Sequence, residues 1–379
     1  MSVWKECTIA DLGTVVGGAT PSTKDSANYD NGTIAWLTPK DLSGYQGRYI
    51  SCGERNITEK GLRSCSTQLM PRHTVLFSSR APIGYVAISE NELCTNQGFK
   101  SIIPNENTDY LFLYYLLKYN KDAIENMGSG TTFKEVSGNT MRGIRVRVPS
   151  DIETQRRIAG VLGSIDDKIE QNIAINNNLA SQAEAIYKAY FSPKIATDVG
   201  QSRTLDEFCE IFTGKKNSNA AIIDGKYKFF TCSPDPLLID SYIYDGDAII
   251  VSGNGAYTGR TRFYSGRFDL YQRTYACTLK NQYPVDYIFP LYWFVRLELS
   301  KKIMGGTRGS AIPYIVMNDL AKFEFAFEQE VFEKYAPIFR TITTTIQSNE
   351  EENETLAQTR ESLLSKLMSG ELDVSEVEI

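Results

Sequence analysis

Side chains that could perform catalysis are few in this sequence, and they form no recognisable constellation. The 379 residues include one histidine, His73, which leaves no histidine cluster for a zinc site and argues against a histidine-based triad. The stretch Gly214-Lys215-Lys216 is not a phosphate-binding loop, because Cys209 and Asn217 stand where that motif needs Gly and Ser or Thr. The sequence therefore offers no simple nucleophile, metal centre or nucleotide site.

Motifs for methyl transfer and for metal-dependent cleavage are also missing. A methyltransferase acting on DNA amino groups needs an Asn/Asp-Pro-Pro-aromatic motif and a Gly-rich cofactor loop, and Ser233-Pro-Asp-Pro236 has a different order. Pro234-Asp235 and Asp166-Asp167-Lys168 resemble nuclease pairs, but such pairs arise by chance in most chains. Gly17-Gly18 and Gly253-x-Gly255 are interpreted as turns. We expect a binding or scaffolding protein that has no catalytic residue, metal or cofactor of its own.

The elements that position the remaining polar residues occur twice along the chain. Residues 165–172 resemble residues 342–349, an offset of 342 − 165 = 177, and Met127-Gly128 falls on Met304-Gly305 at the same offset. Upstream, residues 76–78 resemble 250–252 and residues 96–97 resemble 271–272, at offsets of 174 and 175. The chain is therefore predicted to hold two diverged copies of one unit, each a strand-rich segment followed by a long helix.

Each of the two long helices carries an apolar seam with alternating steps of three and four residues, which is typical of a coiled coil. Two asparagines occupy the same central seam positions in both helices, so an antiparallel pair would bring Asn172 to Asn353 and Asn176 to Asn349. The alternative is two amphipathic helices that each lie on their own domain. The seam residues are Leu162, Ile165, Ile169, Asn172, Asn176, Leu179, Ala183, Ile186 and Tyr190, and Phe339, Ile342, Ile346, Asn349, Asn353, Leu356, Arg360, Leu363 and Leu367.

The ends of these helices are marked by their sequence. Asp151 or Ser150 is the expected start of the first helix and Pro193 its end. The second helix should end near Ser369-Gly370, and Pro337 should start, kink or break it. Between the helices, residues 72–90 and 247–264 alternate strand-like runs with turns, whereas residues 109–127 and 286–304 have a helical period. The predicted fold class is α+β.

The composition predicts a cytoplasmic protein. No run approaches 18 uninterrupted apolar residues, and the first six residues lack the apolar core of a signal peptide. An odd number of cysteines without C-x-x-C spacing indicates ordinary thiols rather than disulfides or metal ligands. They are Cys7, Cys52, Cys65, Cys94, Cys209, Cys232 and Cys277.

The start of the first long helix resembles a known family. Pro149 is followed by Glu153-x-Gln155-x-x-Ile158-Ala159 and then by Leu162-x-x-Ile165-Asp166, a specific pattern in specificity (S) subunits of Type I restriction–modification systems. Residues 360–372 resemble the closing helix of that family. Residues 12–13, 20–22 and 36–41 resemble the start of its target-recognition domain, residues 78–84 and 96–99 the middle, and residues 130–132 a turn near the end. The resemblance covers the whole chain, although Phe332, Tyr335 and Pro337 replace the helix-start motif in the second copy.

The resemblance implies a domain plan and a role. Target-recognition domains would span residues 1–150 and 193–327, the central helix 151–192, and the C-terminal helix with its acidic tail 328–379. Each recognition domain would bind one half of a split double-stranded DNA target, and the paired helices would set the spacing. The subunit would have no catalytic activity and would not bind membranes. It would carry two methylation subunits, which use S-adenosylmethionine, and through them the restriction subunits that use ATP and Mg²⁺.

Candidate DNA contacts lie in the polar turns of each copy, where arginine or lysine suits guanine, asparagine or glutamine suits adenine, and hydroxyls adapt. In the first copy they are Thr38, Lys40, Ser78, Ser79, Arg80, Asn96, Gln97, Lys100, Thr131 and Lys134. In the second copy they are Ser252, Asn254, Tyr257, Arg260, Arg262, Gln272, Arg273 and Arg308. Sequence does not separate contacts to bases from contacts to phosphates.

Taken over the whole chain, the net charge of −6 argues against a nucleic-acid binder. The charge of each segment gives a different result. Residues 1–150 carry 16 − 14 = +2, residues 151–200 carry 5 − 7 = −2, residues 201–327 carry 15 − 13 = +2, and residues 328–379 carry 4 − 12 = −8. Both recognition domains are therefore mildly basic, which predicts weak DNA affinity for the isolated subunit. A stand-alone nucleic-acid-modifying enzyme and a coiled-coil scaffold without DNA binding are the competing hypotheses.

Overall fold

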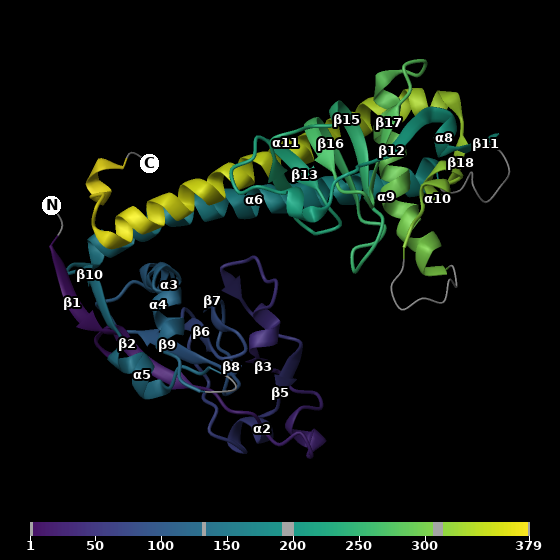
Figure 1. The fold of residues 1–379 in the computed structure, drawn as a ribbon. Helices are drawn as coiled ribbons and strands as arrows, with labels where there is room; N and C mark the ends of the chain where they lie inside the picture. Colours follow the sequence, from purple (N-terminus) through teal and green to yellow (C-terminus); the bar gives the residue numbers. More distant parts are fainter. Residues whose placement is uncertain (1–2, 131–133, 192–200, 306–313, 378–379) are drawn as a thin grey trace. The chain divides into compact units, whose positions relative to one another are not determined.

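A computed structural model describes residues 3–130, 134–191, 201–305 and 314–377 of the chain. It divides into two compact units, the first made of residues 1–170 with 354–379 and the second of residues 171–353. Each unit combines a strand-rich domain with part of each long helix, α6 (Ile152–Tyr190) and α11 (Gln329–Ser369) (Figure 1). No helix within the described ranges is long and apolar enough to cross a membrane.

Unit 1 is built around a five-stranded sheet with the order β2-β9-β6-β7-β4, beside a three-stranded sheet β5-β3-β8 and the pair β1-β10. Its strands are β1 (Trp4–Thr8), β2 (Gly13–Gly17), β3 (Ile34–Leu37), β4 (Tyr49–Ile50), β5 (Arg55–Ile57), β6 (Val75–Ser79), β7 (Ile83–Ser89), β8 (Cys94–Thr95), β9 (Lys100–Pro104) and β10 (Arg145–Pro149). Its helices are α1 (Ile9–Leu12), η1 (Ser26–Asn28), η2 (Pro39–Leu42), α2 (Glu59–Arg63), α3 (Tyr110–Tyr119), α4 (Lys121–Asn126), α5 (Gly138–Gly143) and, in the tail, η5 (Val374–Glu376).

Unit 2 has a six-stranded sheet with the order β12-β17-β15-β16-β13-β14 and the pair β11-β18. Its strands are β11 (Gln201–Thr204), β12 (Cys209–Thr213), β13 (Tyr227–Phe230), β14 (Leu237–Ile239), β15 (Tyr244–Ser252), β16 (Thr261–Leu270), β17 (Thr274–Leu279) and β18 (Glu324–Phe327). Its helices are α8 (Leu205–Phe208), η3 (Ser218–Ala220), η4 (Val285–Tyr287), α9 (Ile288–Gly305) and α10 (Met317–Ala321).

The two sheets share one topology, which confirms the predicted internal repeat. Strands β2-β9-β6-β7-β4 correspond in order to β12-β17-β15-β16-β13, and in both sheets the last of these strands runs parallel to its neighbour. The strand-like runs at 72–90 and 247–264 become β6 with β7 and β15 with β16. The helical runs differ, because Asn120 separates α3 from α4 in unit 1 whereas α9 continues unbroken in unit 2.

Helix α6 begins where the sequence indicates. Asp151 precedes its first residue, and the Asp151 carboxylate accepts a hydrogen bond of 2.7 Å from the backbone N–H of Thr154. That bond satisfies one of the unpaired N–H groups of the first turn. Helix α11 ends at Ser369, followed by Gly370 with a φ of +76°, a conformation that glycine adopts without strain. The Asp151 start and the Ser369-Gly370 end are therefore confirmed.

Of the three effects expected of Pro337, two are wrong, because the proline neither starts nor breaks α11. The helix begins eight residues earlier, at Gln329, and continues through the proline. Pro337 lacks the N–H that would bond the carbonyl of Glu333, and both residues are exposed, so water can take the place of that bond. The neighbouring Ala336 and Phe339 are buried in the core of unit 2, and their packing stabilises the helix across this point.

The helices pair antiparallel through the predicted asparagines. In unit 2, Asn172 Nδ2 donates to Asn353 Oδ1 at 2.9 Å, and Asn349 Nδ2 donates to Asn176 Oδ1 at 2.7 Å. The residue numbers of each pair sum to 525 (172 + 353, 176 + 349), as required when one helix runs up and the other down. Only the expectation that all four amides would be satisfied fails, because Asn172 Oδ1 has no hydrogen-bond partner within the described ranges.

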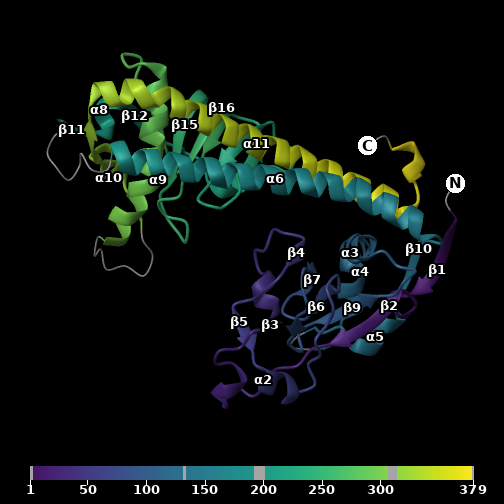
Figure 2. The same cartoon turned by 180° about the vertical axis from the view of Figure 1, so that it is seen from behind.

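In unit 1 the same two helices meet through an ion pair. Arg360 Nη1 lies 2.6 Å from Asp166 Oδ1, and the sum 166 + 360 = 526 matches an antiparallel register. Helices α6 and α11 lie side by side in Figure 1 and also in Figure 2, which shows the molecule from behind. The predicted helix pair, rather than two independent amphipathic helices, is therefore confirmed. The seam residues named above are buried or half-buried, except Tyr190, which is 44% exposed and stacks on Tyr335.

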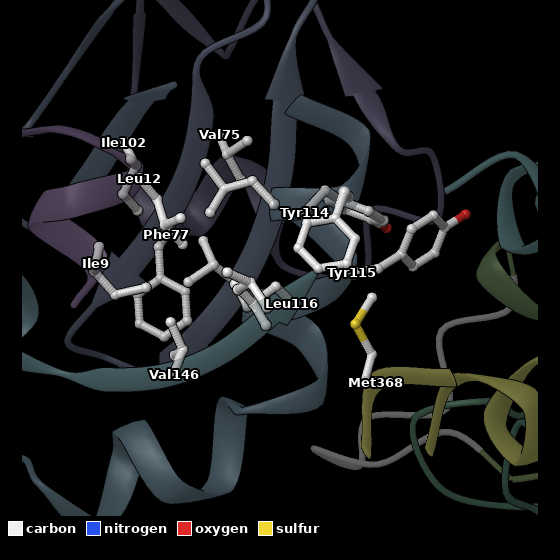
Figure 3. Packing of buried hydrophobic residues seen from close by; sticks show 14 of the residues in the cluster. Ile9, Leu12, Val75, Phe77, Ile102, Tyr114, Tyr115, Leu116, Val146 and Met368 are labelled. Atoms are coloured by element: carbon white, nitrogen blue, oxygen red, sulfur yellow. The ribbon is translucent and has the colours of Figure 1, made fainter. Parts of the chain in front are cut away.

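The buried surface of each helix is wider than the predicted seam, because the helices also pack on their domains. In unit 1, Tyr115 of α3 and Met368 of α11 lie in the same apolar cluster, and Figure 3 shows the two side chains next to each other. Tyr115 Oη also donates to the buried Asp166 at 2.6 Å. Burial and the Asp166 carboxylate raise the pKa of Tyr115 far above its ordinary value, so the phenol stays protonated as the donor.

A second contact attaches the domain of unit 1 to α6. Arg48, whose side chain is 5% exposed, pairs with Asp167 and with Glu170, the latter at 3.0 Å, and donates to the carbonyl of Gly163 at 3.3 Å. Burial by itself lowers the pKa of Arg48, but hydrogen bonds to Glu170 and Asp167 raise it above its ordinary value. This guanidinium therefore stays charged and holds the domain to one face of the helix.

Unit 2 uses aromatic packing for the same attachment. Phe191 at the end of α6 packs edge-on against Phe332 and Phe339 of α11, with ring centroids 5.5 and 5.6 Å apart. Trp293 of α9 lies 6.4 Å from Phe339 and donates its indole N–H to Thr343 Oγ1 at 2.9 Å. Unit 2 thus packs on the long helices through aromatic rings, whereas unit 1 also uses buried charged side chains at this contact.

Candidate nucleic-acid interface

The polar turns of unit 1 gather at one end of its sheet. Gly17 pairs with Lys100 and Ser79 with Ile83, so β2 ends where β9 begins and β6 ends where β7 begins. Ser79 donates its backbone N–H to the carbonyl of Gly98 at 2.7 Å and accepts from the N–H of Val136 at 3.0 Å. Residues 79–82, 96–100 and 134–137, here called loop edge 1, therefore lie next to one another.

Unit 2 repeats this arrangement at the equivalent end of its sheet. Gly253 donates its N–H to the carbonyl of Arg273 at 2.9 Å and accepts from the N–H of Ile315 at 2.8 Å, the same two bonds that Ser79 makes. Ser252 pairs with Thr274 in the sheet. Residues 253–262, 271–275 and 314–316, here called loop edge 2, are therefore the counterpart of loop edge 1.

These shared bonds align the two loop edges residue by residue. Arg80 corresponds to Asn254, because each follows the residue that makes both bonds. Glu135 corresponds to Tyr314, because each precedes the residue that donates its N–H. Lys100 corresponds to Tyr275, because each lies two residues after the carbonyl that accepts. The resemblance of Asn96-Gln97 to Tyr271-Gln272 follows the same alignment. The backbone is thus conserved between the copies while the side chains at the edge differ in charge.

Loop edge 1 carries a small network of opposite charges. The Glu135 carboxylate lies 3.5 Å from Arg80 Nη1 and 3.2 Å from Lys100 Nζ. Lys100 Nζ also donates to Ser79 Oγ at 3.3 Å and to the carbonyl of Gln97 at 3.5 Å. Arg80 and Glu135 are about one third exposed, whereas the Lys100 side chain is 15% exposed. One carboxylate therefore holds two cations at the rim of the sheet.

Loop edge 2 has arginines beside aromatic rings instead. Arg260 lies over the Tyr257 ring at 5.4 Å, and Arg262 lies 6.0 Å from the Phe230 ring and donates to the carbonyl of Ser233 at 3.3 Å. Burial and the nearby Arg260 lower the pKa of Arg262 below its ordinary value. Within the described parts of the chain, no ion pair joins a carboxylate to Arg260, Arg262 or Arg273. The positive charge of loop edge 2 is thus less compensated than that of loop edge 1.

The structure separates the sequence-predicted contacts by accessibility. Ser78, Ser79 and Ser252 are buried, and the hydroxyls of Ser78 and Ser79 are bonded inside their turns. Partly exposed residues are Thr38, Arg80, Asn96, Lys100, Asn254 and Arg262. Exposed ones are Lys40, Gln97, Lys134, Tyr257, Arg260, Gln272 and Arg273. Thr131 and Arg308 lie outside the described residues, and the DNA contacts themselves stay predictions.

Several of these side chains already have structural roles. Thr38 caps η2 by bonding to Asp41 at 2.7 Å, and Lys40 forms an exposed ion pair with Glu54 at 2.8 Å. Asn96 Oδ1 accepts from the N–H of Gly98 at 2.8 Å and so shapes its turn. These bonds favour a supporting role for Thr38 and Asn96.

Sequence reasoning missed Glu135 and Tyr314. An acidic residue is not an obvious part of a DNA-binding edge, and nothing local shows that Glu135 meets Arg80, 55 positions earlier. Tyr314 is 44% exposed and corresponds to Glu135 at an offset of 314 − 135 = 179. The offset of 177 at residue 128 would instead place Glu135 on Ile312, so only the folded sheet aligns Glu135 with Tyr314.

A family profile described as the Type I restriction modification DNA specificity domain matches residues 1–181 and 200–358. The chain belongs to this family. Its two matched stretches follow the two structural copies, so the chain carries two DNA specificity domains and has a recognition role.

Curated relatives agree with this membership. The chain is similar to the Type I restriction enzyme MjaIX specificity subunit of Methanocaldococcus jannaschii, with 30% identity over 99% of this chain and 94% of the relative. It is also similar to the EcoDI specificity subunit of Escherichia coli, with 34% identity over 44% of this chain and 37% of the relative. The S subunit from M. genitalium has a similar fold, with a TM-score of 0.66 at 16% identity over 97% of this chain and 96% of that one.

Proposed function

We propose that this specificity subunit binds a bipartite DNA target, with loop edge 1 contacting one half-site and loop edge 2 the other. One observation carries the proposal, namely that the same polar edge occurs twice on one sheet topology within a single chain. A protein that reads two separated sequences needs two similar binding surfaces with different side chains. The two edges differ in this way where unit 1 has Arg80 and unit 2 has Asn254, because arginine suits guanine and asparagine suits adenine.

The long helices would act as the spacer between the two half-sites. Helix α6 has 39 residues, which corresponds to about 58 Å at 1.5 Å per residue. Its pairing with α11 is fixed by the asparagine layer and by the Asp166–Arg360 ion pair. Polar seam residues fix the register of a coiled coil, since a shift would leave them buried without partners. A fixed register would give a fixed separation.

Catalysis would reside in partner subunits. We propose that two methylation subunits, using S-adenosylmethionine, dock on the two similar halves, and that restriction subunits using ATP and Mg²⁺ join through them. The near-repeat supports this stoichiometry, because two similar units present two similar docking surfaces. The chain itself would supply sequence recognition, and the absence of any motif for methyl transfer or cleavage in its sequence favours that division of labour.

Selection from a random-sequence DNA pool tests the proposal. The full chain, assembled with the methylation subunits of its system, is expected to enrich two short conserved blocks separated by a spacer of constant length. Enrichment of one continuous block, or of no sequence, would contradict bipartite recognition. Methylation or cleavage of DNA by the purified chain alone would contradict the non-catalytic role.

A further inference from the structure

We propose that Arg80 recognises a guanine in the half-site of unit 1, and that Glu135 is the positioning residue that holds the Arg80 guanidinium for this contact. The inference deepens the proposed function by assigning a residue and a base. Arginine binds guanine by donating two hydrogen bonds to O6 and N7 in the major groove, and this geometry requires an oriented guanidinium. The neighbours of Arg80 at loop edge 1 provide that orientation.

Arg80 has donors to spare, and Lys100 does not. An ammonium has three N–H groups, and those of Lys100 have three partners in Glu135, Ser79 and Gln97. A guanidinium has five N–H groups, and Arg80 meets Glu135 through Nη1 at 3.5 Å while its side chain stays 35% exposed. Of the two cations that Glu135 holds, Arg80 is therefore the one able to bind a base.

Glu135 is itself held in place from several directions. Its backbone N–H donates to the carbonyl of Ser129 at 2.9 Å, and its own carbonyl accepts from the N–H of Ser129 at 3.0 Å. The next residue, Val136, is bonded to the end of β6. The carboxylate also forms an ion pair with Lys100, whose side chain is mostly buried. A carboxylate fixed in this way limits the orientations that Arg80 can adopt.

A fixed carboxylate would otherwise be unfavourable at a surface that faces phosphates. Glu135 neutralises part of the positive charge of Arg80 and Lys100, which would otherwise attract phosphates, so the carboxylate lowers general affinity for DNA. Unit 2 has Tyr314 at this position and Asn254 in place of Arg80. The Arg80–Glu135 pair is thus specific to one loop edge, as expected of a contact that distinguishes one half-site from the other.

The test measures base preference in the assembled complex. DNA selection is carried out with the wild-type chain, Arg80→Ala, Arg80→Lys and Glu135→Gln, each with the methylation subunits. Arg63→Ala is the matched control, because Arg63 is an exposed arginine of unit 1 that is not one of the loop edge 1 residues and pairs with Glu59 at 3.7 Å on helix α2.

We expect one guanine position in one half-site to lose its preference in Arg80→Ala, with binding to the wild-type target weakened roughly 5- to 150-fold, the range of one bidentate contact. Arg80→Lys should keep most of the salt-dependent affinity and lose most of the guanine preference. Glu135→Gln should also reduce the guanine preference but bind DNA equally well or more tightly, since a negative charge is removed. Arg63→Ala should leave the motif and affinity unchanged.

Two results would overturn the inference. If Arg80→Ala leaves every position of the motif unchanged, Arg80 does not recognise a base. If Arg80→Ala keeps a cytosine preference that Glu135→Gln loses, then Glu135 contacts the base directly. A wild-type complex that selects no bipartite motif would contradict the proposed function instead, so the two failures are distinguishable.

Discussion

The two units build one topology with different side chains, and at three of four equivalent places an aromatic ring in unit 2 replaces a polar group of unit 1. Unit 1 uses polar groups: the Arg80–Lys100–Glu135 network at its loop edge, and Gln155 and Asp166 on α6. At an offset of 177, Gln155 and Asp166 correspond to Phe332 and Thr343 of unit 2, and its loop edge has Tyr275 and Tyr314 where unit 1 has Lys100 and Glu135.

The comparison shows that the two units keep one backbone topology while different side chains fill its equivalent positions. Gln155 is 1% exposed, and its amide bonds to Asp109 and Pro149, whereas Phe332 packs among aromatic rings. Either solution fills the space beside the long helices. A polar solution depends on every partner being present, whereas an aromatic one depends on volume. The units should therefore respond differently to the same kind of substitution.

The largest effect is expected from Phe339→Ala in unit 2. Phe339 is fully buried between Phe191 and Trp293, so its removal leaves a cavity and should lower the free energy of unfolding by about 3–5 kcal/mol. Urea denaturation followed by tryptophan fluorescence measures this loss, with Phe339→Leu as the milder control. A loss below about 1 kcal/mol would show that aromatic volume does not stabilise unit 2.

A somewhat smaller effect is expected from Asp166→Ala in unit 1. The substitution leaves Arg360 and Tyr115 without their shared partner, and breaking a buried ion pair costs about 3 kcal/mol. The equivalent change in unit 2, Thr343→Val, removes one hydrogen bond from Trp293 and should cost only about 1 kcal/mol. Hydrogen exchange at α3 and α9 measures each unit separately. If both variants lose the same amount of stability, the charged contact of Asp166 stabilises unit 1 no more than the neutral contact of Thr343 stabilises unit 2.

A still smaller, pH-dependent effect is expected at the start of α6. Hydrogen bonds from the backbone and side chain of Thr154 lower the pKa of Asp151 below its ordinary value of 3.8. A lowered carboxyl pKa means that the stabilisation is present at neutral pH and is lost as the pH falls through the folded-state pKa. Asp151→Ala should cost about 1 kcal/mol at pH 7, and less below the folded-state pKa.

Asp151→Asn separates the cap from its charge. Asparagine keeps an oxygen that accepts from Thr154, so this variant should be nearly as stable as the wild type at pH 7 and should not share its loss of stability in acid. Thermal unfolding at pH 7 and in acid provides the measurement. An Asp151→Ala variant as stable as the wild type at pH 7 would show that the cap contributes nothing.

Much of the scaffold could be predicted because its signals are periodic or repeated. The seam placed Asn172 opposite Asn353 and Asn176 opposite Asn349, since an antiparallel register follows from two sequences with one offset. A helix start or break at Pro337 was wrong, because local propensity takes no account of the buried side chains that stabilise the helix around it.

The candidate site could be predicted only as a set of turns. Its key contact joins Arg80 to Glu135 across 55 residues, and the anchor of the domain joins Arg48 to Glu170 across 122. Such pairings depend on the folded sheet and leave no local pattern. Likewise, the polar character of Ser78 and Ser79 suggested contacts with DNA, although both residues are buried in the turn that they shape.

The most direct test of two-site recognition compares one variant from each loop edge in the same DNA selection. Arg80→Ala alters loop edge 1, and Arg273→Ala removes an exposed arginine from loop edge 2. With the methylation subunits bound, each variant should degrade a different half of the enriched motif and leave the other half and the spacer unchanged. If both variants degrade the same half, or both halves equally, the two units do not recognise separate half-sites.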